Sequence, residues 1–75
     1  MSVYIDGQVV AVGERAVLIR IKAVGTRSAT LEPQPEEWIP FSQIEESCVG
    51  IEDLEKDIRV EMKISDYVAT ERGLV

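Results

Sequence analysis

The clearest pattern in the chain is a strict alternation of apolar and charged residues over positions 58–64. The segment reads Ile58-Arg59-Val60-Glu61-Met62-Lys63-Ile64. An extended strand points successive side chains to opposite faces, so this period of two collects the apolar side chains on one face. The pattern predicts a strand that is buried on one side and solvated on the other.

Two more strands, joined by a tight turn, are predicted in the first third of the chain. Gly7 opens the segment Gln8–Val12, which ends at the turn signal Gly13-Glu14-Arg15, and Ala16–Lys22 follows directly. The second of these strands again divides into two faces. The apolar face holds Val17, Ile19 and Ile21, and the other, largely basic face holds Leu18, Arg20 and Lys22.

The regular pattern stops between Ala23 and Glu37, where Pro33 and Pro35 remove backbone donors and favour an extended loop. A short strand around 27–31 remains an alternative within this loop. Glu37–Pro40 then predicts a short strand, and Phe41–Ile44 one helical turn. We expect Trp38, Ile39, Phe41 and Ile44 to pack into the core, because few other large apolar residues are present. For Trp38, an exposed aromatic platform is the alternative.

The acidic stretch 45–57 predicts either a brief strand or a segment that wraps the sheet edge. After the alternating strand, Ser65 is a good N-cap and Asp66 suits a first helical turn. Gly73 stands where the C′ glycine of a short helix belongs. We therefore expect a mainly β fold. It would be a small, bent antiparallel sheet of four or five strands, or an SH3-like or OB-like barrel, with a short C-terminal helix in one domain over residues 1–75.

The absence of histidine from the sequence narrows the chemistry that is possible. Ser/His/Asp and Cys/His triads cannot be built, and no glycine-rich phosphate loop or Cys/His metal motif is present. Cys48 is the single cysteine and is expected to be a small buried apolar residue. We therefore predict a protein that is not an enzyme and that holds no metal or cofactor.

The cysteine content and the lack of a signal-peptide pattern or long apolar run favour a soluble protein of the cytoplasm, or of a host cell's cytoplasm if the chain is phage-encoded. The formal net charge is −6, but the charge is uneven. Residues 1–31 carry four basic residues against two acidic ones, and residues 32–75 carry four against twelve.

Two charged sets are candidate binding surfaces. The acidic set is predicted to bind a protein, and a nucleic-acid-like charge pattern would suit the basic groove of a nucleic-acid enzyme. It comprises Glu45, Glu46, Glu52, Asp53, Glu55 and Asp57, with Glu61 nearby. The basic set would contact phosphates instead, and it comprises Arg15, Arg20, Lys22 and Arg27. For both sets, an ordinary solvated face is the alternative.

The segment Trp38-Ile39-Pro40-Phe41-Ser42-Gln43-Ile44, placed between the predicted hairpin and an ending at Gly73-Leu74, resembles small proteins encoded in bacteriophage and prophage genomes. These carry a Trp-Ile-Pro-Lys-Ser-Gln-Ile type of segment and end in a short helix. The resemblance covers the chain outside the 23–36 loop and implies a phage context and a small barrel-like fold, without a mechanism. Phe41 stands in place of the usual basic residue, which weakens a phosphate-contact role there.

Three functions follow as hypotheses. The first is a phage-type accessory protein that binds and modulates, or inhibits, a host or phage protein through its acidic surface. The second is a nucleic-acid-binding module that uses the region from Arg15 to Arg27. The third is a structural subunit that self-assembles through exposed strand edges, since small domains often gain stability by forming homo-oligomers.

Overall fold

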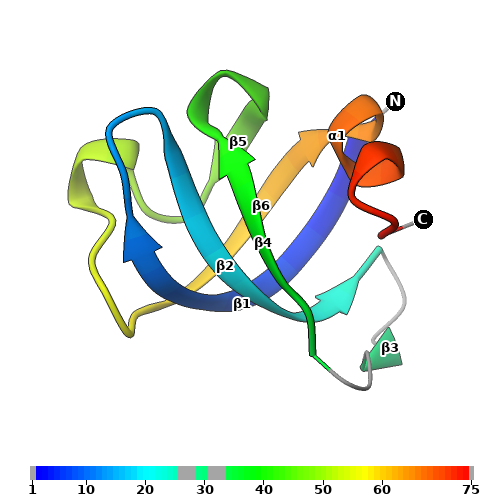
Figure 1. Ribbon diagram of the computed structural model, residues 1–75, viewed down its shortest axis with the longest axis horizontal. Coiled ribbons are helices and arrows are strands. Elements are labelled where there is room, and N and C mark those ends of the chain that lie inside the picture. The colour runs from blue at the N-terminus through cyan, green and yellow to red at the C-terminus, as the bar shows by residue number, and fades with distance from the viewer. Residues whose placement is uncertain (1, 26–28, 31–33, 75) are drawn as a thin grey trace.

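The computed structural model describes residues 2–25, 29–30 and 34–74 (Figure 1). The elements in these residues follow one another in the order β1 (Ser2–Val12), β2 (Ala16–Val24), β3 (Ala29–Thr30), β4 (Glu36–Pro40), the 3-10 turn η1 (Phe41–Gln43), β5 (Ile44–Ser47), the 3-10 turn η2 (Ile51–Asp53), β6 (Arg59–Ser65) and α1 (Asp66–Glu71).

The strands form one antiparallel sheet in the order β3-β2-β1-β6-β5, and β4 also pairs with β2. Figure 1 shows how strongly this sheet is bent. β4 and β5, which lie at opposite edges of the sheet, are joined by η1 but do not pair with each other in the described residues. The predicted mainly β fold with a bent sheet and a short C-terminal helix is confirmed, and the sheet stays open rather than closing into a barrel.

The bend is built into both strands of the β1–β2 hairpin. Their register shifts between Asp6 and Gly7, where Lys22 of β2 is the extra residue, and between Val9 and Ala11, where Val10 of β1 is the extra residue. Such irregularities increase the local twist of a strand and bend it. Gly7 also lets β1 approach β2 closely, because a Cβ atom there would lie 2.6 Å from Cγ2 of Ile19. The strand begins at Ser2, earlier than predicted, because its first half pairs with β6.

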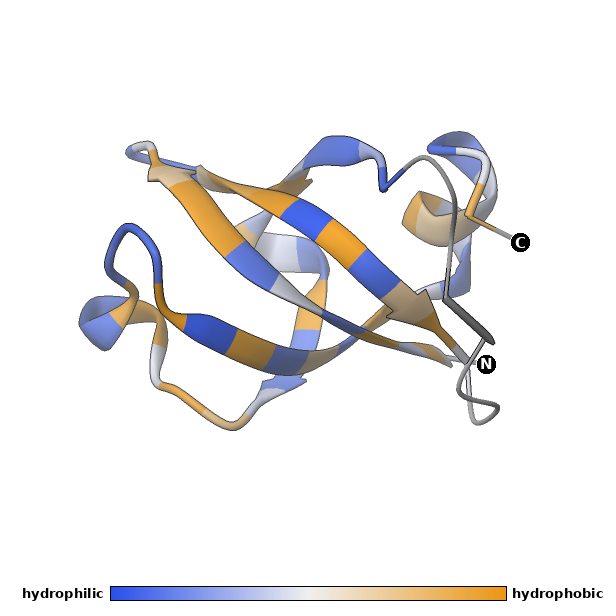
Figure 2. Ribbon diagram, turned by 90° about the horizontal axis from the view of Figure 1, so that it is seen from below, coloured by the Kyte–Doolittle hydropathy of each residue, from blue (hydrophilic) through white to orange (hydrophobic). Residues whose placement is uncertain are grey.

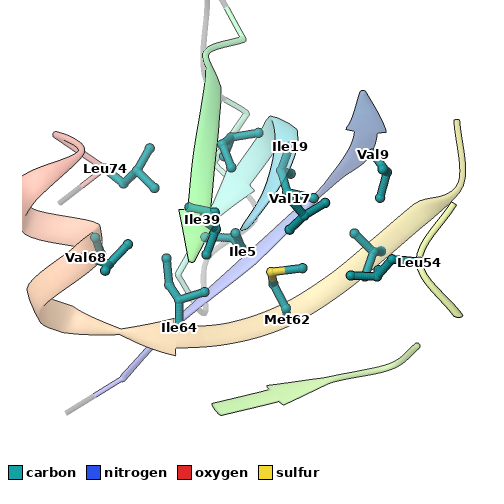
Figure 3. Close-up of a cluster of buried hydrophobic side chains, with 13 residues drawn as sticks. Ile5, Val9, Val17, Ile19, Ile39, Leu54, Met62, Ile64, Val68 and Leu74 are labelled. Atoms are coloured by element: carbon teal, nitrogen blue, oxygen red, sulfur yellow. The ribbon is translucent and has the colours of Figure 1, made fainter. Parts of the chain in front are cut away.

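The core lies inside the bend and is wholly apolar in the described residues, with no buried polar or charged residue among them. Figure 2 shows the alternation of apolar and polar residues along the strands, and Figure 3 shows side chains of β6 pointing toward those of β1, β2 and β4. The buried hydrophobic residues are Ile5, Val9, Val17, Ile19, Ile21, Ile39, Leu54, Val60, Met62, Ile64, Val68, Ala69 and Leu74. The predicted apolar faces of β2 and β6 are therefore confirmed.

The C-terminal helix has the predicted cap at each end. The Ser65 hydroxyl accepts a hydrogen bond from the Val68 N–H at 3.3 Å. Gly73 has a φ of +72°. Its N–H donates to the Thr70 carbonyl at 3.1 Å, and the Leu74 N–H donates to the Ala69 carbonyl at 2.8 Å. This pair of hydrogen bonds ends the helix and turns Leu74 back into the core.

Two side chains that were expected in the core are exposed. Trp38 is 45% exposed because its neighbour Ile39, paired with Val17, takes the inward position, and successive residues of a strand face opposite sides. Cys48 is exposed because it follows β5 on the outer, charged face beside Glu61. Phe41 and Ile44 pack against the core while partly exposed, as predicted for packing residues.

Candidate interaction surfaces

The acidic residues of the 52–57 loop are displayed on a fixed backbone. Leu54 anchors the loop in the core with 7% of its surface exposed. The Asp57 N–H donates to the Val9 carbonyl at 2.7 Å, and the Gln8 amide donates to the Asp57 carbonyl at 3.1 Å. We call this loop the acidic segment. Its exposed carboxylates belong to Glu52, Asp53, Glu55 and Asp57, and none makes an ion pair within the described residues.

The other two predicted acidic residues lie on β5 rather than on the acidic segment. Glu45 accepts a hydrogen bond from the Ser2 hydroxyl at 2.5 Å. Glu46 lies opposite Lys63 of β6, two residues beyond the exposed Glu61. The structure therefore divides the predicted acidic set between a strand at the sheet edge and a loop.

The predicted basic set does not gather at one place. Arg20 is paired with Glu36 across β2 and β4, with 2.8 Å between Nη2 and Oε2. Arg15 lies in the turn before β2, and Lys22 lies within β2, seven residues farther along the chain. Because an extended chain rises by about 3.3 Å per residue, the two are roughly 20 Å apart. Arg27 falls outside the described residues. The three described members thus offer separate charges rather than one basic patch.

An ion pair on the outer face joins Asp6 of β1 to Arg59 of β6, with 2.8 Å between Oδ2 and Nη2. The hydrogen bond from Arg59 is the main reason that the pKa of Asp6 falls below its ordinary value of 3.8. Partial burial opposes this change, and the positive charges of Arg59 and Lys22 add to it. Ionised Asp6 is therefore stabilised more in the folded state than in the unfolded state.

We expect Asp6→Asn to be less stable than the wild type at pH 7 and to lose this difference in acid. A carboxyl with a lowered pKa in the folded state stabilises the fold above its unfolded pKa, and this contribution disappears as the pH falls through the folded value. Urea unfolding at about pH 7, 5 and 3 measures the effect. An equal deficit of Asp6→Asn at all three pH values would contradict the assigned role of the ion pair.

Trp38 is exposed but firmly held. A Cβ atom on Gly13 would lie 3.5 Å from Cζ3 of Trp38, so the indole packs over the turn between β1 and β2. Leu18 lies opposite Trp38 on the neighbouring strand. The Arg72 side chain donates to the Trp38 carbonyl at 3.1 Å. The exposed platform was the alternative interpretation of this residue, and the structure favours it.

A shallow pocket of about 280 Å³ opens on the outer face between β1, β5 and β6. We call it the Tyr4 pocket, and it is lined by Tyr4, Glu46, Ser47, Cys48, Glu61, Met62 and Lys63. The ammonium group of Lys63 lies 5.8 Å from the centre of the Tyr4 ring. The sequence analysis did not identify this pocket, because its walls come from three segments that are brought together only by strand pairing.

Within the described residues, no group of three or more His, Cys, Asp or Glu side chains is placed to hold a metal ion. In the same part of the chain, no helix is long and apolar enough to cross a membrane. Comparison with known proteins finds no matching family model, no similar curated protein and no similar solved structure.

Proposed function

We propose that this chain is a non-catalytic, phage-type accessory protein that binds a protein partner through its acidic segment and modulates or inhibits it. The observation that carries the proposal is a loop whose backbone is held by Leu54 and by the hydrogen bonds of Asp57 and that displays four exposed carboxylates. Because the loop backbone is already in place before binding, little backbone entropy is lost on association.

The negative charge of the acidic segment indicates which class of protein partner it would bind. Carboxylates arranged on a rigid surface attract a basic groove of the kind that nucleic-acid-handling proteins use for phosphates. Such attraction speeds association and selects partners of opposite charge more than it adds affinity. Occupation of the groove would exclude the nucleic acid and inhibit the partner.

The test is an affinity pull-down from a host lysate, with and without nuclease. We expect a specific protein that survives nuclease treatment and that is lost with the double variant Asp53→Lys and Glu55→Lys. Asp57 is changed only to asparagine, because its φ of +74° is tolerated by Asp and Asn better than by lysine. Glu14→Lys is the matched control for Glu55→Lys, because it makes the same charge change at an exposed turn outside the acidic segment.

A protein that the double variant Asp53→Lys and Glu55→Lys still captures as well as Glu14→Lys does would contradict recognition by the acidic segment. Recovery of nucleic acid alone would favour a second candidate, a nucleic-acid-binding module. That candidate is supported by the exposed Trp38, which lies across from Leu18, with Arg20 two residues farther along β2. It predicts an affinity that falls steeply with salt and is lost in Arg20→Ala with Lys22→Ala.

Assembly through the β4 edge is disfavoured by two features. Pro40 lacks an N–H, and the carbonyl of Trp38 is already occupied by Arg72. A solution mass well above 8.4 kDa would support the hypothesis of a self-assembling subunit.

A further inference from the structure

The outer walls of the Tyr4 pocket follow from the strand register. Tyr4 of β1 and Glu46 of β5 both lie opposite Lys63 of β6, one from each side. Cys48 continues from β5, and its N–H donates to the Glu61 carbonyl at 3.0 Å. Residues that lie opposite each other across antiparallel strands point to the same face, so these side chains surround one depression.

The pocket lies beside the free edge of the sheet. Among the described residues, β5 pairs only with β6. The backbone of Cys48 faces β6 through its N–H, and backbone groups alternate in direction along a strand. The main-chain N–H and C=O of the preceding residue, Ser47, therefore point outward, where an added strand can bind them.

The chemistry of the pocket suits a cation on a long side chain. Glu46 and Glu61 line it and make no ion pair in the described part of the chain, and Glu45 lies next along β5. The Lys63 ammonium group already lies over the Tyr4 ring, so the carboxylates, rather than the ring face, supply the attraction for a further cation. The three carboxylates outnumber the one ammonium group, so the rim attracts positive charge.

We propose that the Tyr4 pocket and the free edge at Ser47 form a docking site for an extended, basic segment of a protein partner. A strand added beside β5 would lie about 4.8 Å from it, so a lysine or arginine side chain could reach across β5 into the pocket. The pocket, at about 280 Å³, is smaller than typical drug-sized sites of about 300–1,000 Å³, which favours a single side chain. This inference deepens the proposed function and rests on it, because it states the chemistry of the protein partner.

Cys48 provides a reporter in the unmodified protein, because it is the single cysteine of the chain, is exposed and lines the pocket. The probe is an amidated seven-residue peptide of alternating lysine and valine, and the control peptide has norleucine in place of lysine. We expect the lysine peptide to slow alkylation of Cys48 by iodoacetamide and to slow hydrogen exchange of the Ser47 amide. The norleucine peptide should do neither. If the lysine peptide leaves both rates unchanged, the proposal is wrong.

Variants distinguish binding of the lysine peptide in the Tyr4 pocket from general attraction between opposite charges. Glu46→Gln and Glu61→Gln should each weaken peptide binding by about threefold to fivefold, as expected for loss of an exposed ion pair. Tyr4→Ala should also weaken it, because it removes the side chain that forms one wall of the pocket. Glu14→Gln is the matched control, because it removes the same charge from an exposed turn outside both the pocket and the acidic segment. An equal loss in Glu14→Gln would overturn the proposal, because it would show attraction without a site.

The two proposals can fail separately. If a partner is captured and lost with Asp53→Lys and Glu55→Lys but is unaffected by Glu46→Gln with Glu61→Gln, the docking site is wrong and the proposed function stands. If the lysine peptide protects Cys48 but no protein survives nuclease in the pull-down, the site binds basic peptides and the proposed function is wrong.

Discussion

Replacement of Gly7 by alanine is expected to remove a substantial part of the free energy of unfolding. The added Cβ atom would clash with the carbonyl oxygen of Arg20 and would lie 2.6 Å from Cγ2 of Ile19. The oxygen belongs to the backbone of β2 and cannot move without disturbing the sheet. Overpacking of this kind costs about 1–3 kcal/mol, and more where backbone must shift, against roughly 4–11 kcal/mol for a domain of this length. Urea unfolding followed by circular dichroism measures the loss.

Gly50→Ala is the control for this prediction. A Cβ atom at Gly50 would meet the Glu52 side chain, with Oε1 at 3.0 Å, and that flexible, exposed side chain can move away. We expect only a small change in stability. If Gly7→Ala were as stable as Gly50→Ala, β1 and β2 could not approach each other as closely as the structure shows.

Ile19→Ala is expected to cost about 2–5 kcal/mol, because it opens a cavity at a fully buried position in the middle of β2. In so small a domain, such a loss leaves a large fraction of the molecules unfolded at moderate urea concentrations. The measurement is the urea midpoint at constant slope, which separates lower stability from a change in the unfolded state.

Leu18→Ala is the matched control, since it makes the same chemical change at the next residue of the same strand. Leu18 lies half-buried on the outer face opposite Trp38, so its loss should cost about 1 kcal/mol or less. The strand propensity of alanine is common to both variants and cancels in the comparison. Equal costs at the two positions would contradict the assignment of the inner and outer faces of β2.

Much of this fold could be predicted from local patterns. The faces of β2 and β6 follow from the period of two, and the helix follows from Ser65 and Gly73. The positions of Trp38 and Cys48 could not be predicted in the same way. Burial of an aromatic residue was inferred from the scarcity of large side chains, whereas the pairing of β4 with β2 assigns the inward position to Ile39.

The candidate sites also differ in how far they could be predicted from local patterns in the sequence. The acidic residues and their uneven distribution are visible in the sequence, but only the structure shows that Leu54 and Asp57 hold four of them in place on one loop. In the predicted basic set, the charge of Arg20 is neutralised by Glu36. The sequence does not reveal this, because it does not specify that β2 pairs with β4. The Tyr4 pocket had no sequence signal, since its walls are distant along the chain.

The class of the fold, the inner faces of its regular strands, the ends of its helix and the lack of histidine-based chemistry follow from local patterns in the sequence. Each of these depends on residue type or on the spacing of residues a few positions apart. Which strands are neighbours, where the β1–β2 hairpin bends, that the sheet is open in the described residues, and which side chains share a surface follow only from the folded arrangement. These properties depend on the pairing of strands far apart in the chain, and local spacing does not select the partner or the register of a strand.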